Sequence, residues 1–544
     1  MNATQSPPVP DSPAAQAAFV AGMLDPAAYA DLHPVSGPVR CIETHVSWVF
    51  LTGQFAYKVK KPLRLSFIDY STAARRAECC REELRLNQRN APGLYLGVVP
   101  IVGTFAAPRI GAGDTDGSAP AFEHAVRMVQ FDPAQELGHL LQAAAVTPQE
   151  CADLGARVAQ MHATASRVEL DAPYGVPETV HRVTLDNFDE LARWVATAEE
   201  ASLLQSLQHR ARSLFEASRM RMTARRERGC IREGHGDLHC GNVVRWQGVL
   251  VPFDGLEFDP ALRWIDVAND IAFLTMDLAA HQRDDLRREA LQAWLTAAGD
   301  FDALTLLPYY ELYRALVRAK VAALRGQQAG ATAQPSASKP RYLAWAATRI
   351  TRPAPALVLM AGLSGSGKTW FGARIASHMQ ALVVRSDVER KRLAGLPPLA
   401  SSASPPDGGL YSIDFNARTY ARLRECAAAS LLGGESIVVD AANLRRDERA
   451  QFVALARKHG ATPVIVHCTA PLEILRARVA ARAAAAADAS EATVALLERQ
   501  PSYWEPFGAD ELDRVVTVDT TDPQAIDRAL PAVAALTAAR RDAS

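Results

Sequence analysis

The 544-residue sequence predicts an α+β domain followed by an α/β domain with a doubly wound parallel sheet. Three observations predict this order. The chain is too long for a single hydrophobic core, because cores stop growing near ~250–300 residues. Three short strand-like runs open the chain, and a mostly helical stretch follows from about residue 148. After residue 356, five apolar strand-like runs alternate with helical segments, which is typical of a parallel sheet.

Composition narrows the class of protein. The formal charge of −1 argues against broad nucleic-acid binding, which needs a clustered basic face. The eight cysteines are scattered without C-x-x-C spacing, as expected for free thiols in a reducing compartment. The first residues contain neither a basic cluster nor an apolar core, and no apolar run approaches the ~20 residues of a membrane helix. We therefore expect a cytoplasmic protein without a membrane partner.

The domain boundaries follow from composition. We predict a flexible N-terminal lead over residues 1–20, a first domain over 21–324, a linker over 325–355 and a second domain over 356–544. The linker begins with RGQQAGATAQPSASKP, which is rich in Gly, Ala, Ser and Gln, and ends near a second break at TRPAPA. Between these breaks, YLAWAATRI has the pattern of a short bridging helix.

The first domain opens with strand-like runs at 39–45, 46–52 and 55–61, and the last two are joined by a hairpin turn at Thr52-Gly53-Gln54. A helix is expected next, over 74–89. The segment 309–325 has helical periodicity and is expected to be the last helix of this domain. The strand-like runs of the second domain are 357–362, 382–387, 436–441, 462–468 and 513–519.

The second domain contains the motif G-x-x-x-x-G-K-T between a predicted strand and a predicted helix. Its backbone N–H groups can surround phosphate oxygens, and the start of the helix adds a favourable partial charge. Lys368 is expected to reach the β- and γ-phosphates of ATP, and the Thr369 hydroxyl to bind Mg²⁺. The residues expected to cradle the phosphates are Gly362, Ser364, Gly365, Ser366, Gly367, Lys368 and Thr369.

The run Arg385-Ser-Asp387-Val-Glu-Arg390 places a carboxylate at the end of the second strand, beside the crevice where an acceptor binds. Here the sequence resembles small P-loop kinases of the polynucleotide-kinase, gluconate-kinase and zeta-toxin kind. The resemblance implies that Asp387 acts as the base or orienter of an acceptor hydroxyl. It also implies that Arg390 contacts the acceptor or its phosphate. The alternative is a helix N-cap with a solvated arginine.

Further candidates follow the later strands. Asp440 ends a buried strand, where it acts on Mg²⁺ or is only structural. The same resemblance places Asn443 in the acceptor site and an arginine-bearing lid after the fourth strand. Arg478 and Arg482 share one helix face at i,i+4 and are expected to clamp the γ-phosphate as catalytic groups, or else to form a solvated basic face. Residues Gln500 to Pro506 have no predicted role.

The first domain contains His235-Gly-Asp237-Leu-His239-Cys-Gly-Asn242, followed by Asp254-Gly-Leu-Glu257. Phosphoryl transfer needs one carboxylate to orient the acceptor hydroxyl, and an amide with a second carboxylate to hold Mg²⁺. Asp237 fits the first role, and Asn242 with Asp254 fits the second. Asp266 and Asp270 are expected to brace the structure.

These motifs resemble the aminoglycoside-phosphotransferase and choline-kinase group, whose fold is protein-kinase-like. The resemblance implies that Lys58 holds the α- and β-phosphates, with Lys60 as the fallback. It implies that Glu83 pairs with this lysine, with Glu82 as the alternative. The segment Glu43 to Ser47 stands where protein kinases have a glycine-rich phosphate loop, so the contribution of that loop stays open.

Together, THVSWVFLTGQFAYKVKKP and LSFIDYSTAARR resemble a bacterial kinase-like family that is fused to a P-loop domain. The resemblance implies a bifunctional phosphotransferase in which each half uses ATP and Mg²⁺ to phosphorylate a small-molecule hydroxyl. Two alternatives stay open. One is a regulatory module that senses a ligand or phosphorylates protein, and the other is a nucleic-acid end kinase in the P-loop half. Neither acceptor, nor the oligomeric state, is predicted.

Overall fold

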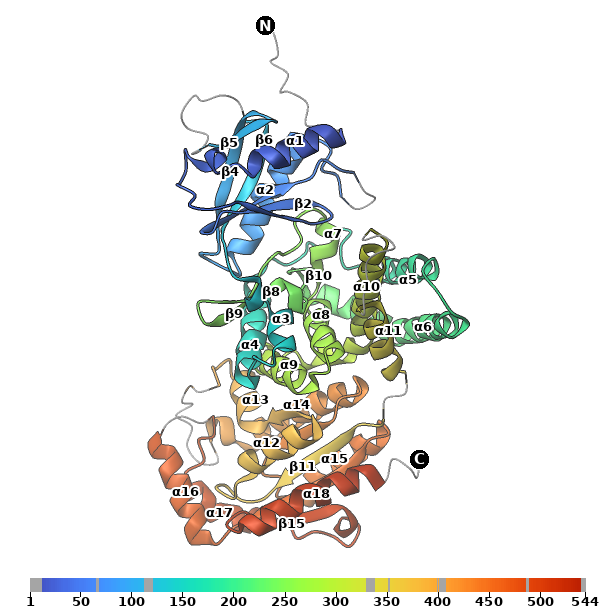
Figure 1. Cartoon of the computed structure of the whole chain (residues 1–544). Coiled ribbons are helices and arrows are strands. Elements are labelled where there is room, and N and C mark those ends of the chain that lie inside the picture. Colours follow the sequence, from blue (N-terminus) through green and yellow to red (C-terminus); the bar gives the residue numbers. More distant parts are fainter. Residues whose placement is uncertain are drawn as a thin grey trace. The chain divides into compact units, whose positions relative to one another are not determined.

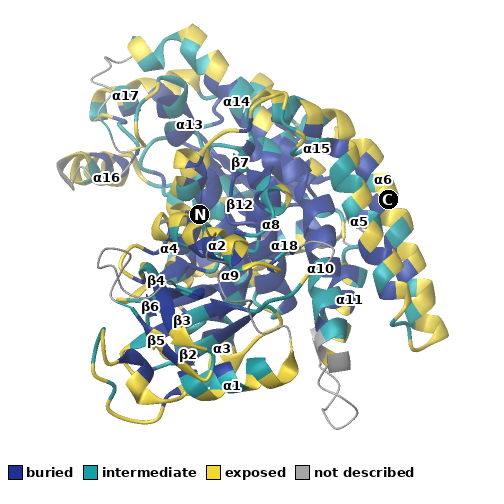
Figure 2. Ribbon diagram, turned by 90° about the horizontal axis from the view of Figure 1, so that it is seen from above, coloured by how far each residue is buried: buried dark blue, intermediate teal, exposed yellow. Residues whose placement is uncertain are grey.

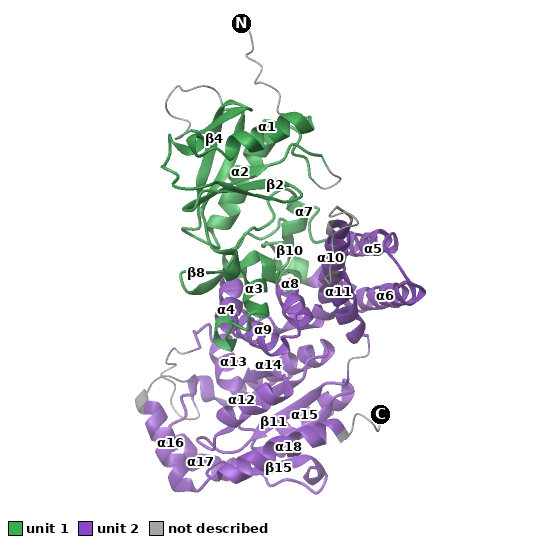
Figure 3. Ribbon diagram, in the orientation of Figure 1, with its two compact units in different colours: residues 1–150, 161–176, 225–270 green, residues 151–160, 177–224, 271–544 purple. Residues whose placement is uncertain are grey.

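The computed structural model describes residues 12–64, 68–111, 121–328, 338–350, 353–398, 400, 408–485 and 489–539 (Figure 1). Two compact units divide the chain in an interleaved way (Figure 3). Unit 1 comprises residues 1–150, 161–176 and 225–270, and unit 2 comprises residues 151–160, 177–224 and 271–544. Unit 2 therefore contains helices from the predicted first domain as well as the whole predicted second domain.

Unit 1 contains a six-stranded antiparallel sheet with the strand order β1-β2-β3-β6-β4-β5. The three predicted strands are present, with β3 paired to β2 on one side and to β6 on the other. The bounds are β1 Arg40–Glu43, β2 Ser47–Leu51, β3 Phe55–Lys60, β4 Tyr95–Thr104, β5 Ala107–Ile110 and β6 Glu123–Val129.

The strands β4, β5 and β6 were not predicted from the sequence. In β4 the apolar run YLGVVPIVGT contains two glycines and a proline, residues that are depleted in strands. The strand nevertheless forms because β6 pairs along most of its length and covers its buried residues from Val99 to Val102. Tertiary pairing therefore overrides the weak local preference of this segment.

The predicted flexible lead over residues 1–20 is wrong for its second part. Helix α1 (Pro13–Met23) begins at Ser12, whose hydroxyl accepts a hydrogen bond from Ala15 N. Its Phe19 is buried against Trp48 and Phe50 of the sheet. The first eleven residues lie outside the described part of the chain. Burial of Phe19 and Met23 thus fixes a segment whose sequence is otherwise alanine-rich against the sheet.

The remaining elements of unit 1 hold the motif loops. Helix α2 (Ala73–Gln88) follows β3 and confirms the predicted helix. Strand β7 (Ile231–Glu233) leads into the HGD segment, and the hairpin of β8 (Val243–Trp246) and β9 (Val249–Pro252) leads into Asp254. The other elements are η1 Pro26–Tyr29, η2 Pro133–Gln135, α3 Leu137–Gln142, α4 Pro148–Thr164, η3 Cys240–Asn242, α7 Pro260–Arg263 and β10 Trp264–Asp266. Helix α4 contributes residues to both units.

The helical part of unit 2 packs around α8 (Val267–Ala280), in which every residue is buried (Figure 2). Phe273 and Met276 of this helix share a core with Leu312, Leu316 and Tyr342. No helix in the part of the chain that the structure describes is long and apolar enough to cross a membrane. The bounds are α5 Pro177–Ala192, α6 Ala198–Glu227, α9 Asp284–Ala298, η4 Phe301–Thr305, α10 Leu307–Gln328 and α11 Ser338–Thr348.

The predicted bridging helix is present as α11, and its Tyr342 and Trp345 pack into this core. The linker therefore contains an ordered, packed segment. Helix α10 extends three residues past the predicted start of the linker. Residues 329–337 and 351–352 of the predicted linker lie outside the described residues.

The predicted doubly wound parallel sheet is confirmed. All five strands are parallel and lie in the order β12-β13-β11-β14-β15, with helices in each connection. The strands are β11 Ala356–Ala361, β12 Leu382–Arg385, β13 Ile437–Asp440, β14 Thr462–Thr469 and β15 Val515–Asp519. The helices are α12 Lys368–Met379, α13 Ser386–Leu393, η5 Gly409–Tyr411, α14 Ile413–Leu432, α15 Arg446–Lys458, α16 Leu472–Ala485, α17 Val494–Arg499, η6 Gln500–Tyr503, η7 Leu512–Arg514 and α18 Pro523–Ala539.

Replacing Phe19 with alanine is expected to destabilise unit 1 by about 3 kcal/mol, because it removes a buried aromatic side chain and leaves a cavity. Urea unfolding followed by tryptophan fluorescence measures the change, and Ala17→Ser at an exposed position of the same helix is the control. An unchanged unfolding midpoint for Phe19→Ala would show that α1 does not contribute to the core.

Candidate functional site

Three charged side chains meet beside the central strand β3 of unit 1. The Nζ atom of Lys58 lies 2.9 Å from Oε1 of Glu83 on α2 and 2.5 Å from Oδ1 of Asp254. Burial lowers the pKa of a lysine, but Asp254 and Glu83 outweigh it and raise the pKa of Lys58 well above its usual value. Lys58 therefore stays a cation, and it links the strand, the helix and the loop that carries the predicted metal ligand.

The second lysine of the strand has a different environment. Lys60 points the same way as Lys58 because side chains alternate along a strand. Its Nζ atom lies 2.7 Å from Oε2 of Glu83 and also contacts Glu257. Tyr70 completes the group through a 2.5 Å hydrogen bond to Glu257. Because Lys60 is only 1% exposed, we assign it a structural role. Lys58 is the lysine that faces Asp254.

The structure also decides between the two glutamates. Glu83 is fully buried and bridges both lysines, whereas Glu82 accepts hydrogen bonds from Arg85 and Arg263. Burial alone would raise the pKa of Glu83, but the two ammonium groups lower it to about 2. Glu257 and Tyr70 were not predicted as partners of this group, since no local pattern links them to Lys60.

The HGD segment places its acidic residue against the predicted metal ligand. Asn242 donates from Nδ2 to Oδ2 of Asp237 at 2.8 Å and to the Asp237 carbonyl at 3.0 Å. Phe253 N donates to the Asn242 carbonyl at 2.9 Å, so Asp254 follows directly beside this amide. Asp254 itself has a φ of +59°, which turns its carboxylate out of the hairpin toward Lys58. The predicted trio of Asp237, Asn242 and Asp254 is thus brought together.

A buried carboxylate holds this segment in place. Asp270 accepts hydrogen bonds from the backbone N–H groups of His235 and Gly236, at 2.7 and 3.0 Å, and lies 3.1 Å from His162 Nε2. Burial would raise the pKa of Asp270, but the hydrogen bond from His162 and the other contacts lower it to about 2. The predicted bracing role of Asp270 fits these contacts. Asp266 likewise pairs with buried Arg225 and caps α8 through Ala268 N.

In unit 2 the G-x-x-x-x-G-K-T loop joins β11 to α12, as predicted. Gly365 and Gly367 have φ values of +80° and +85°, which only glycine adopts without strain. Lys368 donates to the Leu363 carbonyl at 2.7 Å, across the loop. Burial lowers the pKa of Lys368, although Asp440 and Asp387 oppose the shift. A desolvated cation with incomplete compensation is stabilised further by an anion such as a phosphate.

The predicted metal-binding pair of this loop is also formed. The Thr369 hydroxyl donates to Oδ2 of Asp440 at 2.7 Å, and Arg385 lies 3.7 Å from the same oxygen. Burial raises the pKa of Asp440, although Thr369 and Arg385 oppose this. Both side chains offer oxygen ligands, which Mg²⁺ prefers. No cluster of three or more His, Cys, Asp or Glu side chains suited to a metal occurs within the described ranges. The available residues therefore fit a metal that is shared with phosphate oxygens.

The acceptor candidates lie at the end of β12. Asp387 is half-buried in the first turn of α13, and its charge affects both Lys368 and Tyr411. Arg390 is nearly buried and donates to the Leu410 carbonyl and to Asn416 Oδ1, with its guanidinium 5.0 Å from the Tyr411 ring centre. Its neighbours are therefore the first turn of α14 and the segment before it, and not bulk solvent.

Asn443, which was predicted to contact the acceptor, lies inside the domain in this structure. Asn443 is completely buried, and its Nδ2 donates to the Met360 carbonyl of β11 at 2.6 Å. Its φ of +47° is tolerated by asparagine in tight turns. The residue thus links the end of β13 to the strand before the phosphate loop.

The two predicted lid arginines lie close to the loop but differ in their contacts. Arg478 donates to Thr520 Oγ1 at 2.8 Å and to the Gly365 carbonyl at 3.3 Å. Arg482 is half-buried one turn later, and its charge contributes to the lowered pKa of Lys368. The alternative prediction, a purely solvated basic face, therefore does not describe Arg478 and Arg482.

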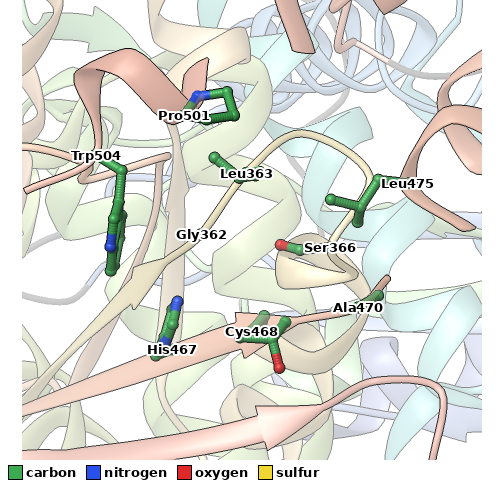
Figure 4. Close-up of a pocket in the computed structure, with 10 residues that line it drawn as sticks. Gly362, Leu363, Ser366, His467, Cys468, Ala470, Leu475, Pro501 and Trp504 are labelled. Atoms are coloured by element: carbon green, nitrogen blue, oxygen red, sulfur yellow. The ribbon is translucent and has the colours of Figure 1, made fainter. Parts of the chain in front are cut away.

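A cavity of about 190 Å³ adjoins the loop (Figure 4). His467 and Trp504 form one wall of the cavity, with ring centres 4.8 Å apart and nearly parallel planes. Ser366 of the loop lines the same cavity (Figure 4). Burial and the charge of Arg449 lower the pKa of His467 to about 4, so this imidazole is neutral at physiological pH. Gln500 accepts a hydrogen bond from Ser364 N at 2.7 Å. Gln500 and Trp504 belong to the segment without a predicted role, and no motif signalled their contact with the loop.

Known proteins resemble this chain both in its C-terminal domain and over most of its length. Residues 357–507 match the family model described as "AAA domain". Uncharacterised proteins of Mycobacterium tuberculosis and Mycobacterium bovis are each 28% identical over 477 residues, covering 87% of this chain and 93% of theirs.

Two solved structures are similar to separate parts of the chain. A choline/ethanolamine kinase family protein from Mesorhizobium loti covers 62% of this chain and 93% of its own, with 12% identity and a TM-score of 0.35. A gluconokinase from Sinorhizobium meliloti 1021 covers 36% of this chain and 99% of its own, with 23% identity and a TM-score of 0.26.

Replacing Glu83 with glutamine is expected to lower the stability of unit 1 at pH 7 by roughly 3 kcal/mol, because two buried ammonium groups lose their shared counter-charge. The pKa of Glu83 is depressed in the fold, so its stabilisation is present above pH ~4.5 and is lost as the pH falls toward 2. The difference in melting temperature between the wild type and Glu83→Gln should therefore shrink from pH 7 to pH 3. A difference that does not change with pH would contradict the ion-pair assignment.

The family match and the geometry of the two sites lead to one conclusion. The chain joins a region with a lysine–glutamate pair and an HGD segment to a P-loop domain that matches the family model described as "AAA domain" at residues 357–507.

Proposed function

We propose that the protein is a bifunctional phosphotransferase, and that each site transfers the γ-phosphoryl group of ATP to a hydroxyl of a small molecule. The observation that carries this proposal is the 2.8 Å contact between Asp237 and Asn242, with Asp254 and Lys58 beside them. A nucleotide-binding scaffold needs the lysine and the metal ligands, but it has no need of the extra carboxylate. Each domain keeps such a carboxylate, Asp237 in one and Asp387 in the other.

In the kinase-like site, Lys58 would hold the α- and β-phosphates, and Glu83 keeps the ammonium in place. Asn242 and Asp254 would hold Mg²⁺, which neutralises charge on the phosphates when it is bound. Asp237 would accept the hydrogen bond of the acceptor hydroxyl and then its proton. The amide of Asn242 donates a hydrogen bond to Oδ2 of Asp237 and so orients the carboxylate for this task.

In the P-loop site, the N–H groups of Gly365 to Thr369 and the Lys368 ammonium would bind the phosphates. Thr369 and Asp440 would hold Mg²⁺. Asp387 would orient the acceptor hydroxyl. Arg478 and Arg482 would stabilise charge on the transferring group, which requires Arg478 to exchange its carbonyl contact for a phosphate oxygen.

The acceptors are proposed to be small molecules in the cytoplasm. The eight cysteines all lie in the described residues as thiols outside disulfide bonds, and five of them are buried, which is typical of proteins that stay in a reducing compartment. The near-neutral formal charge of −1 does not favour an extended nucleic-acid partner. Protein phosphorylation and end-labelling of nucleic acid remain distinct outcomes of the experiments below.

Asp237→Asn is expected to reduce turnover in the kinase-like site by a factor of ~10²–10⁴, because the acceptor hydroxyl loses its base. The assay is an untargeted metabolite screen for ATP-dependent gain of one phosphate, with Asp171→Asn at an exposed position as the matched control. Label that moves from γ-labelled ATP to protein would instead favour a regulatory kinase. If neither site turned over with a broad panel of alcohols, the proposed function would be wrong.

Lys368→Ala is expected to abolish the other activity and to weaken nucleotide binding in unit 2, because the phosphates lose their buried cation. The same screen measures the activity, and the affinity for a fluorescent ATP analogue in an Asp237→Asn background measures binding. Lys458→Ala, at an exposed position of α15, serves as the control. Salt-sensitive labelling of oligonucleotide ends by the wild type but not by Lys368→Ala would reassign this site to nucleic acid.

A further inference from the structure

Strand β12 lies at the edge of the parallel sheet, and one of its residues is paired by a side chain. Val383 N donates to Oε1 of Gln292 at 2.7 Å, and Nε2 of Gln292 donates to the Val383 carbonyl at 3.0 Å. Both contacts lie within unit 2. The carboxamide of Gln292, on α9, therefore replaces one residue of a neighbouring strand. An unpaired edge would otherwise leave this N–H and C=O to water.

The helix that follows β12 is fastened to the same part of unit 2. Arg392 of α13 donates to the Thr296 carbonyl, and Arg422 of α14 donates to the Gly299 carbonyl, both at 2.6 Å. Glu389 is 2% exposed and accepts from both arginines, at 3.1 and 2.9 Å. Backbone carbonyls at the end of α9 and just after it thus hold α13 and α14. These carbonyls are present whichever side chains Thr296 and Gly299 carry.

A buried ion group makes a third link. Arg287 of α9 lies 2.8 Å from both Glu311 of α10 and Glu435, which precedes β13. All three side chains are at most 5% exposed. Burial opposes the charge on Arg287, but the two glutamates raise its pKa above the ordinary value. The contact of α9 with the sheet is therefore specified by charge as well as by hydrogen bonds.

These links converge on the proposed acceptor carboxylate. Asp387 comes four residues after Val383, in the first turn of α13. The strand has only four residues, so its position relative to β11 depends on β13 on one side and on Gln292 on the other. We infer that Gln292 is a positioning residue that sets the place of Asp387 in the P-loop site, although it lies outside residues 356–544. This inference rests on the proposed role of Asp387.

The phosphate loop should not respond to the same contact. It follows β11, the central strand, which is paired on both sides by β13 and β14. Loss of the Gln292 contact should therefore displace Asp387 and leave nucleotide binding intact. A displacement of about 1 Å at a reacting group can reduce the rate by about 100-fold. We expect Gln292→Leu to reduce turnover about 10-fold or more, with nucleotide affinity within about 2-fold of wild type.

A glutamate at this position supplies a readout that a general structural defect would not produce. A protonated carboxyl group accepts from Val383 N and donates to the Val383 carbonyl, as the amide does. The ionised form cannot donate, and it places a negative charge against that carbonyl. The site therefore favours the neutral acid, which raises the pKa of the new carboxyl group above ~4.3. Gln292→Glu should be active at low pH and lose activity as the pH rises.

The experiment uses the full chain carrying Asp237→Asn, so that the P-loop site is measured alone. The probe is Mg-ATP with water as the acceptor, and the rate of Gln292→Glu is divided by the rate with Gln292 intact at each pH from 5 to 8. The expected ratio approaches one at pH 5 and falls to that of Gln292→Leu at pH 8. Ala297→Glu, which adds an exposed carboxylate to the same helix, should give a flat ratio. A flat ratio for Gln292→Glu overturns the inference.

Failure of the proposed function gives a different result. If the parent protein turns over ATP neither with water nor with the panel of alcohols, and Lys368→Ala changes nothing, the proposed reaction of the P-loop site is wrong. Hydrogen exchange then tests whether Gln292 sets the position of Asp387. Gln292→Leu should accelerate exchange of the amides from Val383 to Arg390 at least 10-fold and leave those of β14 unchanged. Unchanged exchange over Val383 to Arg390 would overturn the inference by itself.

Discussion

The packing of both units depends on the free-energy cost of removing charged side chains from water. A buried ammonium or guanidinium group is tolerated only where carboxylates or carbonyls surround it. In unit 1 this requirement draws strand β3, helix α2 and the hairpin loop together, because Lys58 and Lys60 share Glu83 and each takes a further carboxylate. The geometry proposed to bind phosphate is therefore also what holds the sheet to the helix.

Unit 2 satisfies the same constraint with arginines. Arg287 joins α9 to the sheet, and Arg449 lies completely buried against Glu511 and the carbonyls of Asn443 and Leu444. The second arginine anchors the turn after β13 and the segment that contains Trp504, whose ring lies 5.6 Å from its guanidinium. Arg287 and Arg449 thus hold segments of the P-loop domain in place without contacting the phosphate loop itself.

The phosphate loop is held differently, through its backbone. Gln500 binds Ser364 N, Arg478 binds the Gly365 carbonyl, and Lys368 closes the loop on the Leu363 carbonyl. Of these, the contacts of Lys368 and Arg478 can be exchanged for contacts to phosphate oxygens. Such preformed but exchangeable contacts keep the site ordered and still leave binding energy for the nucleotide.

The sequence alone determined the two motifs, the five parallel strands and the residues proposed to bind phosphate, because each depends on local chemistry. Glycines at the positions with positive φ, a lysine before a helix, and carboxylates at strand ends are constraints that short segments impose. Asp237, Asn242 and Asp254 could be grouped in advance for the same reason.

What only the tertiary structure decided are contacts between segments far apart in the chain. These include the choice of Glu83 over Glu82, the pairing of β4 with β6, and the burial of Phe19 and Asn443. Gln292 is the clearest case, since nothing near it in sequence points to Val383, 91 residues away. Such contacts are set by which surfaces meet after folding, and periodicity or spacing in the sequence does not encode them.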